Sequence, residues 1–186
     1  EPFNVQEGVR LVAALDAWVL GEISLREVFG DSKDLGPNAP AGIHLTDHPP
    51  LGRLWIGLFH TLTASVAPLE QHPNGFQISV ACARPASAAA FALLVFLVGC
   101  VTAKWYGPSS GLVAAASVVM MPRVFGHAHL ASLETCIGLT YTAAVLCVAS
   151  FWKPPASPSM KAALLTGAVF GLALLTKIQA ILIPIP

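Results

Sequence analysis

Residues able to do chemistry are concentrated in three short segments of this chain. The first is the acidic start, Phe3–Gly8, and the second is Asp47–Arg53, in which an acid and an imidazole precede two prolines. The third is Pro122–His129, which is followed by Glu134. Carboxylates and imidazoles move protons, and arginines stabilise anionic leaving groups. The three segments therefore favour a reaction that combines proton transfer with binding of a negatively charged group.

Two carboxylates are the candidate catalytic groups. Glu7 either contacts the reacting groups or is a first-turn acid that stabilises a helix N-terminus, and the two interpretations carry equal weight. Asp47 either acts chemically or caps the entry to the apolar helix that follows it. Its neighbour His48 is a candidate substrate-binding residue, although solvation of the same entry is the simpler explanation.

The third segment places ionisable residues next to a long apolar run. If it forms one helix, Arg123, His127 and Glu134 share a face, because the separations through Leu130 are four, three and four residues. An ionisable residue inside an apolar span is costly and usually faces a partner or a water-filled cavity. We therefore favour a functional cavity over a purely structural ion pair. His127 and His129 point apart on a helix, so a divalent metal site is not indicated.

The composition explains where these segments must lie. Of the 186 residues, 55% are hydrophobic and 11% are charged, whereas an ordinary soluble domain has roughly 25% charged residues. Residues 1–50 hold eight of the ten carboxylates, and residues 51–186 hold seven of the ten lysines and arginines. This pattern excludes a nucleic-acid-binding protein, which needs a basic stripe, and a disordered chain, which needs low hydrophobicity. It indicates a membrane protein.

The chain divides into a polar layer and a set of membrane helices. Residues 1–50 are expected to form an extracytoplasmic loop with an interfacial helix at Gly8–Leu20 and a short helix at Ser24–Phe29, which Ser24 and Glu27 cap reciprocally. Residues 51–186 are expected to form the transmembrane part, with helices at about 51–67, 85–106, 111–121 (short), 130–152 and 162–185. The predicted fold class is all-α, a polytopic membrane helix bundle with an extracytoplasmic loop that carries interfacial helices.

Two further features concern the chain ends and the cysteines. The sequence begins without methionine and stops at the end of an apolar run, so we interpret it as a fragment of a longer protein. The four cysteines have neither zinc-ligand spacing nor the pattern of a disulfide framework. We expect them to be small apolar residues of the spans.

Four segments resemble motifs of one family, in the same order and with matching spacing. Asp47–Arg53 resembles the HPPL-Gly-Lys signature of protein O-mannosyltransferases and related lipid-linked glycosyltransferases (glycosyltransferase family 39). Arg84–Ala88 resembles the Arg-x-Pro-Ser/Ala entry into the next span. Pro122–Glu134 and Leu174–Lys177 are similar to two later motifs of the same superfamily.

The resemblance implies the GT-C fold and an enzyme that moves a sugar from a polyprenyl-phosphate carrier to an acceptor hydroxyl, with inversion. It also implies a catalytic Asp-Glu pair in the first extracytoplasmic loop, and that pair is Gln6-Glu7 here. Because Gln6 cannot act as a base, either Glu7 takes the role, or Asp47 does, or the chain departs from the standard members. Basic residues would stabilise the departing lipid phosphate.

The sequence as a whole therefore predicts an integral membrane glycosyltransferase that acts on the extracytoplasmic side. The expected catalytic residues are Glu7 and Asp47. The expected substrate-binding residues are Arg10, His48, Arg53, Arg123, His127 and Glu134. The expected partners are a polyprenyl-phosphate-linked sugar, a hydroxyl acceptor on a protein, glycan or lipid, and membrane lipids, with no nucleic acid. The sequence indicates no particular cofactor, and a divalent metal stays open as the less favoured alternative. The expected location is the cytoplasmic membrane of a bacterium, as a multi-pass protein.

Two alternatives stay open. The chain is a non-catalytic membrane protein that binds a polyprenyl lipid, which the absence of an Asp at position 6 would explain. A proton-coupled transporter with Glu134 and His127 as a relay is less favoured, since the sequence shows no internal repeat.

Overall fold

The computed structural model describes residues 2–29, 49–68, 70–71, 77–152 and 159–182. Over these ranges the chain is helical except for loops and one antiparallel pair of two-residue strands. In chain order the elements are α1 (Pro2–Val19), α2 (Leu25–Phe29), α3 (Pro50–Thr63), β1 (Glu70–Gln71), β2 (Gln77–Ile78), α4 (Val80–Tyr106), α5 (Pro108–Val119), α6 (Pro122–Ala128), α7 (Leu133–Phe151), α8 (Met160–Thr176) and the short 3₁₀ helix η1 (Ile178–Leu182).

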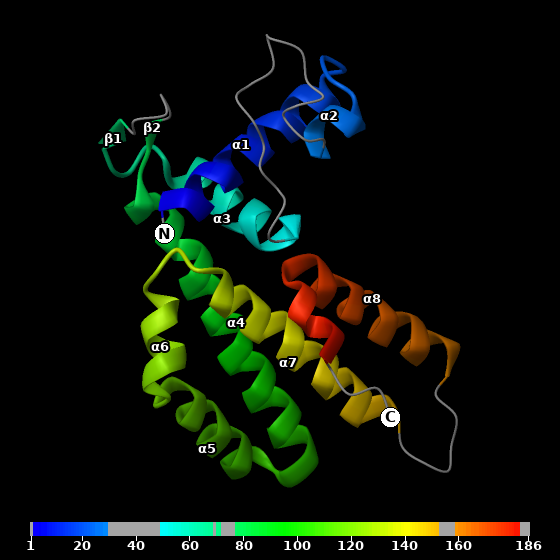
Figure 1. The fold of residues 1–186 in the computed structure, drawn as a ribbon. Coiled ribbons are helices and arrows are strands. Elements are labelled where there is room, and N and C mark those ends of the chain that lie inside the picture. The colour runs from blue at the N-terminus through cyan, green and yellow to red at the C-terminus, as the bar shows by residue number, and fades with distance from the viewer. Residues whose placement is uncertain (1, 30–48, 69, 72–76, 153–158, 183–186) are drawn as a thin grey trace.

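The helices form two parts that lie end to end (Figure 1). At one end, α1 lies across α3, and α2 folds back beside α1. The other part is a bundle in which α5 packs along α4 and α8 packs along α7, while α4 and α7 contact each other. The predicted all-α helical bundle is confirmed.

Two of the described helices are long and apolar enough to cross a membrane, namely α4 and α7. Helix α4 has 27 residues, which corresponds to about 40 Å at roughly 1.5 Å per residue. Helices α5 and α6 together form a third candidate, a broken span or a re-entrant loop with a bend of 70°. The break follows from Pro122, because the residue before a proline avoids helical backbone and Met121 is extended (φ −74°, ψ 107°).

Several helix bounds differ from those expected. The predicted interfacial helix Gly8–Leu20 begins six residues earlier, at Pro2. The predicted span at 51–67 corresponds to α3, whose 14 residues extend about 21 Å, less than a hydrocarbon core of about 30 Å. Helix α3 is thus not among the candidate spans by length and composition. It packs against α1 and α4.

The later predicted helices change as well. The segment predicted at 85–106 begins at Val80, and the short segment at 111–121 begins at Pro108. The helix predicted at 130–152 begins only at Leu133, where Ser132 is the N-cap. The helix predicted at 162–185 ends at Thr176, since the backbone becomes extended at Lys177 (φ −159°, ψ 131°) before η1 begins.

Helices α1 and α3 cross at a pair of glycines. A Cβ atom added at Gly8 would lie 2.8 Å from the backbone nitrogen of Gly57 and would also overlap the carbonyl oxygen of Arg53. A Cβ atom added at Gly57 would overlap the backbone of Gly8 in return. The two backbones are therefore in direct contact, and no larger residue fits at either position.

A hydrophobic cluster joins the two parts of the molecule. Its buried members come from α1, α3, β2, α4, the loop before α7, and α7: Val5, Ile56, Ile78, Ala83, Ala86, Ala131 and Leu133. Trp55 of α3 packs against the cluster and donates a hydrogen bond from its indole nitrogen to the Ala86 carbonyl at 2.8 Å. This cluster fixes the α1–α3 pair on the end of the bundle.

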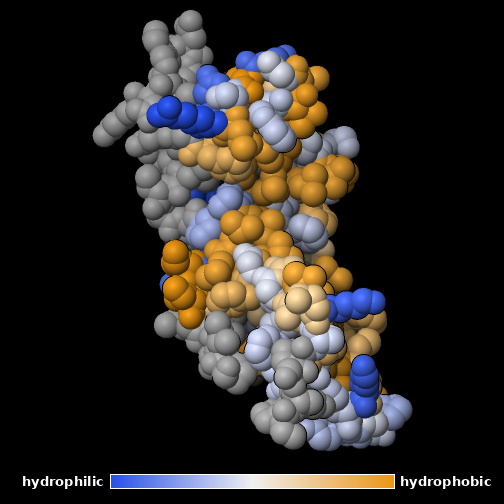
Figure 2. Space-filling model, turned by 90° about the vertical axis from the view of Figure 1, so that its right-hand side faces the viewer, coloured by the Kyte–Doolittle hydropathy of each residue, from blue (hydrophilic) through white to orange (hydrophobic). Residues whose placement is uncertain are grey.

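The outer surface of the bundle is apolar. Figure 2 shows hydrophobic side chains over much of one side of the molecule, with hydrophilic side chains gathered mainly towards its two ends. On α8 the exposed hydrophobic residues are Met160, Leu164, Leu165, Leu172 and Leu175. Such a surface is typical of helices that face lipid, and it agrees with a membrane protein.

Candidate functional site

Glu7 lies inside the contact between α1 and α3. Its side chain is 3% exposed, and its Oε1 accepts a hydrogen bond at 3.1 Å from Nη1 of Arg10, one turn further along α1. Gly8, the next residue, is the point at which α1 touches α3. Glu7 is therefore held by its own helix and by the helix crossing, in an ion pair with Arg10.

Arg53 is the basic residue that α3 contributes to the same contact. It is 1% exposed, and its guanidinium carbon lies 5.2 Å from the centre of the Phe3 ring at the start of α1. Its carbonyl oxygen faces Gly8. The structure thus brings three of the predicted site residues, Glu7, Arg10 and Arg53, to one helix crossing.

The remaining residues of the second motif are not part of this geometry. Asp47 and His48 lie outside the residues that the structure describes. The proposed roles of Asp47 as a carboxylate catalyst and of His48 as a substrate contact therefore stay predictions.

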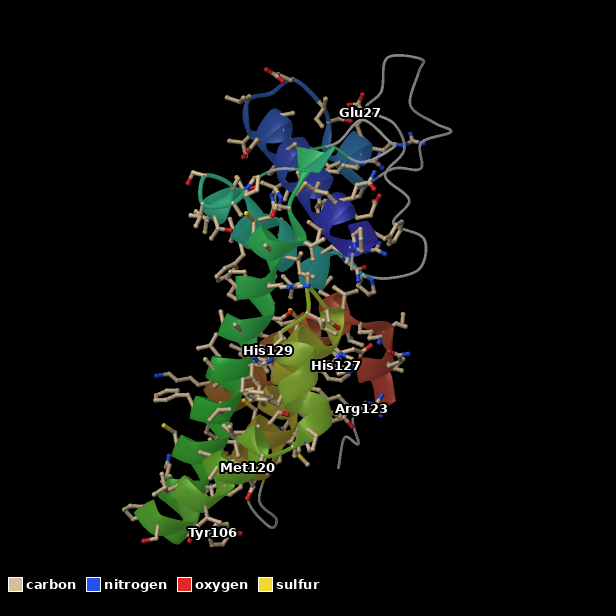
Figure 3. The ribbon with its side chains drawn as sticks, turned by 90° about the vertical axis from the view of Figure 1, so that its left-hand side faces the viewer. Glu27, Tyr106, Met120, Arg123, His127 and His129 are labelled. Carbon is tan, nitrogen blue, oxygen red and sulfur yellow. The ribbon has the colours of Figure 1, made fainter. Side chains whose placement is uncertain are left out.

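Arg123, His127 and Glu134 do come together, although they do not lie on one helix. Arg123 and His127 lie on α6, which ends at Ala128, whereas Glu134 is the second residue of α7. Figure 3 shows Arg123 and His127 one above the other on one side of α6, with His129 on the other side. All three predicted residues line one cavity of about 370 Å³ between α4, α5, α6 and α7.

Glu134 is not in the middle of the apolar helix. Its backbone N–H donates to the Ser132 hydroxyl at 3.1 Å, so it belongs to the capped first turn of α7. Its side chain is 47% exposed and accepts a hydrogen bond at 2.6 Å from Nζ of Lys177, where α8 ends. An acid in the first turn is favourable to the helix dipole, and the ion pair ties α7 to α8.

Two residues of this region were not among the predicted site residues. Lys177 interrupts an apolar run and closes one of the family-like motifs, which was the signal for it in the sequence. Thr135 lines the cavity and is 3% exposed. Its only sequence signal is that Gly138 and Thr142 follow at helical spacing, which places small and polar residues on one face of an apolar helix.

The two groups of charged residues lie next to each other at the junction of the two parts. A Cβ atom at Gly52 would lie 2.7 Å from Cδ2 of Leu133 and 3.5 Å from Cγ2 of Thr176. The beginnings of α3 and α7 and the end of α8 therefore meet at one point. The residue that follows each of these three is charged: Arg53, Glu134 and Lys177.

No group of three or more His, Cys, Asp or Glu residues close enough to hold a metal ion occurs within the described ranges. The chemistry that these ranges can support is proton transfer by a carboxylate and electrostatic stabilisation by arginine, lysine and histidine.

Comparison with known proteins identifies a family and no individual relative. Comparison of the chain with curated proteins and with solved structures finds no match. The family model described as dolichyl-phosphate-mannose-protein mannosyltransferase matches residues 43–186, which is more than half of the chain and includes α3 to α8. The family is one of membrane glycosyltransferases, as the four motifs imply. The chain belongs to the dolichyl-phosphate-mannose-protein mannosyltransferase family.

Proposed function

We propose that the chain is part of a multi-pass membrane glycosyltransferase that takes a sugar from a polyprenyl-phosphate donor and transfers it to a hydroxyl acceptor on the extracytoplasmic side. The family name points to mannose as the sugar and to a protein as the acceptor. One observation carries the proposal: the helix crossing that holds Glu7, Arg10 and Arg53 contacts the end of the bundle at which α7 begins and α8 ends.

The reaction needs two kinds of group, and both occur at the junction. The acceptor oxygen attacks the anomeric carbon while the bond from that carbon to the phosphate oxygen breaks, which inverts the configuration. The acceptor proton passes to a carboxylate, and the lipid phosphate leaves with the bonding electron pair. Basic side chains stabilise the charge that develops on this phosphate.

Glu7 is the described carboxylate that fits the role of the base. Arg10 donates a hydrogen bond that fixes the direction of one carboxylate oxygen of Glu7. The substrate must then reach an acid that is 3% exposed. Asp47 is the competing candidate for the same role.

The proposal is tested by a transfer assay on the full-length protein, with radiolabelled polyprenyl-phosphate mannose and an acceptor peptide or membrane fraction. Glu7→Gln should lower turnover by a factor of about 10² to 10⁴, which is typical of the loss of a general base, and should leave donor binding largely intact. Glu27→Gln is the matched control, because Glu27 is a carboxylate in the capping turn of α2 and not at the junction.

The outcomes separate the candidates. Loss of activity in Asp47→Asn together with full activity in Glu7→Gln would assign the base to Asp47. An intact protein that binds the donor but transfers no sugar to any acceptor would overturn the proposal in favour of a non-catalytic lipid-binding protein.

A further inference from the structure

An open groove lies on the surface of the bundle between α4 and α5. It has a volume of about 700 Å³, and its lining includes Phe91 and Phe96 of α4 together with Leu112 and Val119 of α5. The side chains of Phe96 and Leu112 are 68% and 74% exposed. The groove therefore presents apolar side chains to the surroundings of the bundle.

Small residues form the floor of this groove. A Cβ atom added at Gly111 of α5 would lie 2.5 Å from Cβ of Ala103 on α4, and one added at Gly99 of α4 would lie 3.2 Å from Cβ of Ala115 on α5. All four of these residues line the groove. Small residues let two membrane helices approach closely, so the floor is backbone and methyl groups, and the larger side chains form the walls.

The length of the groove matches one leaflet of a bilayer. Phe91 and Ala103, which both line it, are twelve residues apart on α4. This separation corresponds to about 18 Å at roughly 1.5 Å per residue, and one leaflet contributes about half of a hydrocarbon core of about 30 Å. A lipid acyl chain that lies along the groove is therefore accommodated over most of its length.

The end of the groove at the α4–α5 turn is basic. Pro108 lines this end, and Lys104 is an exposed residue in the last turn of α4. The sequence has no Asp or Glu between positions 71 and 133, so neither α4 nor α5 carries an acid that would compensate the charge of Lys104. The neighbouring rings of Trp105 and Tyr106 have their centres 6.2 Å apart, and aromatic residues at helix ends typically lie at the level of the lipid headgroups.

This end of the bundle is the one opposite α1 and α2. Figure 3 shows Tyr106 and Glu27 at opposite ends of the molecule, and in Figure 1 the ends of α4 and α7 both lie away from α1. Lys161, the second residue of α8, is also exposed. Basic residues are enriched on the cytoplasmic side of membrane proteins, where the leaflet is rich in anionic lipids. The charge of this end therefore fits an anionic headgroup.

We propose that the α4–α5 groove binds an anionic phospholipid, with one acyl chain along the groove and the phosphate against Lys104. The match between groove length and one leaflet selects a lipid as the occupant, and the uncompensated positive charge at the groove end selects an anionic one. The inference goes beyond the proposed function and does not depend on it, because the groove belongs to α4 and α5 and not to the junction that holds Glu7.

The test measures lipid binding to the full chain purified in detergent. The protein is incubated with an equimolar mixture of phosphatidylglycerol and phosphatidylcholine with identical acyl chains, and native mass spectrometry measures how much of each lipid is bound. Lys104→Gln removes the charge at the groove end, and Lys161→Gln is the matched control at the same end of the bundle. Cys100 lines the groove and is exposed, so Cys100→Phe fills the groove, and Cys100→Ala controls for loss of the thiol.

We expect the unaltered protein to prefer phosphatidylglycerol, and Lys104→Gln to bind this lipid about fivefold more weakly, the usual effect of one basic residue at an anionic lipid surface. Lys161→Gln should keep the preference. Cys100→Phe should bind less of both lipids, whereas Cys100→Ala should bind as the unaltered protein does. An unchanged preference in Lys104→Gln, or unchanged binding in Cys100→Phe, would overturn the inference.

The same spectra test a second copy of this chain as the competing occupant. Under the proposal, the lipid is bound to the monomer. A lipid-free dimer that Cys100→Phe converts to a monomer would overturn the inference and assign the groove to a contact between copies. None of these measurements requires sugar transfer, so failure of the proposed function would leave the test of the groove unchanged.

Discussion

Replacement of Gly8 by alanine tests whether the α1–α3 crossing positions Glu7. The added Cβ atom would lie 2.8 Å from the Gly57 nitrogen, whereas ordinary van der Waals contact begins at 3.4 Å. The difference, 3.4 minus 2.8, requires the two helices to separate by about 0.6 Å at this contact alone. The overlap with the Arg53 carbonyl oxygen requires a larger movement. Because both neighbours are backbone atoms, no side chain can rotate away to relieve the contact.

The energetic cost follows from the same geometry. Overpacking of a close contact usually costs about 1 to 3 kcal/mol, which for a chain of this size lowers the melting temperature by about 2 to 12 °C. The movement also displaces Glu7, the preceding residue, and a misplacement of about 1 Å in a catalytic group can cost on the order of 10²-fold in rate. We therefore expect Gly8→Ala to lower both the melting temperature and the transfer rate.

The assay is thermal unfolding of the detergent-solubilised protein, followed by tryptophan fluorescence, together with the transfer assay. Gly171→Ala is the control, because a Cβ atom at Gly171 of α8 meets nothing within 4 Å and alanine is the better helix former. The double variant Gly8→Ala/Gly57→Ala should lose less stability than the two single variants lose together, because one separation of the helices relieves both overlaps. An unchanged melting temperature in Gly8→Ala would refute the close crossing of the two helices.

Two further predictions concern the ends of α3 and α7. His60 is 4% exposed, its Nε2 accepts a hydrogen bond from the Ser79 N–H at 3.0 Å, and burial lowers its pKa below 6.5. Because the fold holds the neutral form, its stabilisation is complete above pH 6.5 and is lost as the pH falls through the lower folded pKa. The melting temperature should therefore drop on acidification below pH 6.5, and His60→Gln should weaken this dependence; an equal drop in both proteins would contradict the assignment. Ser132→Ala should lower the stability by about 1 kcal/mol through loss of the α7 N-cap, and an unchanged melting temperature would show that the cap contributes nothing.

The local features of the chain could be predicted well. The reciprocal cap of α2 is confirmed: the Ser24 N–H donates to Oε2 of Glu27 at 2.6 Å, and the Glu27 N–H donates to the Ser24 hydroxyl at 3.3 Å. This motif involves residues three apart, so neighbouring side chains are sufficient to specify it. The apolar runs that become α4 and α7 were recognisable for the same reason, because hydropathy and length are local properties.

The helix predicted at 130–152 begins three residues late, and Pro122–Glu134 is not one helix, because contacts between distant segments intervene. Residues 129–132 leave the helix, and the Ser132 N–H donates to the Ser87 hydroxyl of α4 at 3.3 Å, while that hydroxyl donates to the Ser132 carbonyl at 3.2 Å. A residue 45 positions away thus helps to set where α7 begins. Helical spacing within the segment contains no information about such a partner.

The sequence by itself determined that this chain is a helical membrane protein of a recognisable family, and which acidic and basic residues are available for chemistry. These properties depend on composition, local capping and the order of motifs along the chain, and none of them requires the packing of the helices to be known. The tertiary structure alone decided that Glu7 is buried beside Arg10, that Arg123, His127 and Glu134 share a cavity from two different helices, and that Thr135 faces that cavity. The physical reason is that burial and pairing depend on which backbones can approach, and the direct contact of Gly8 with Gly57 exists only once α1 and α3 have crossed.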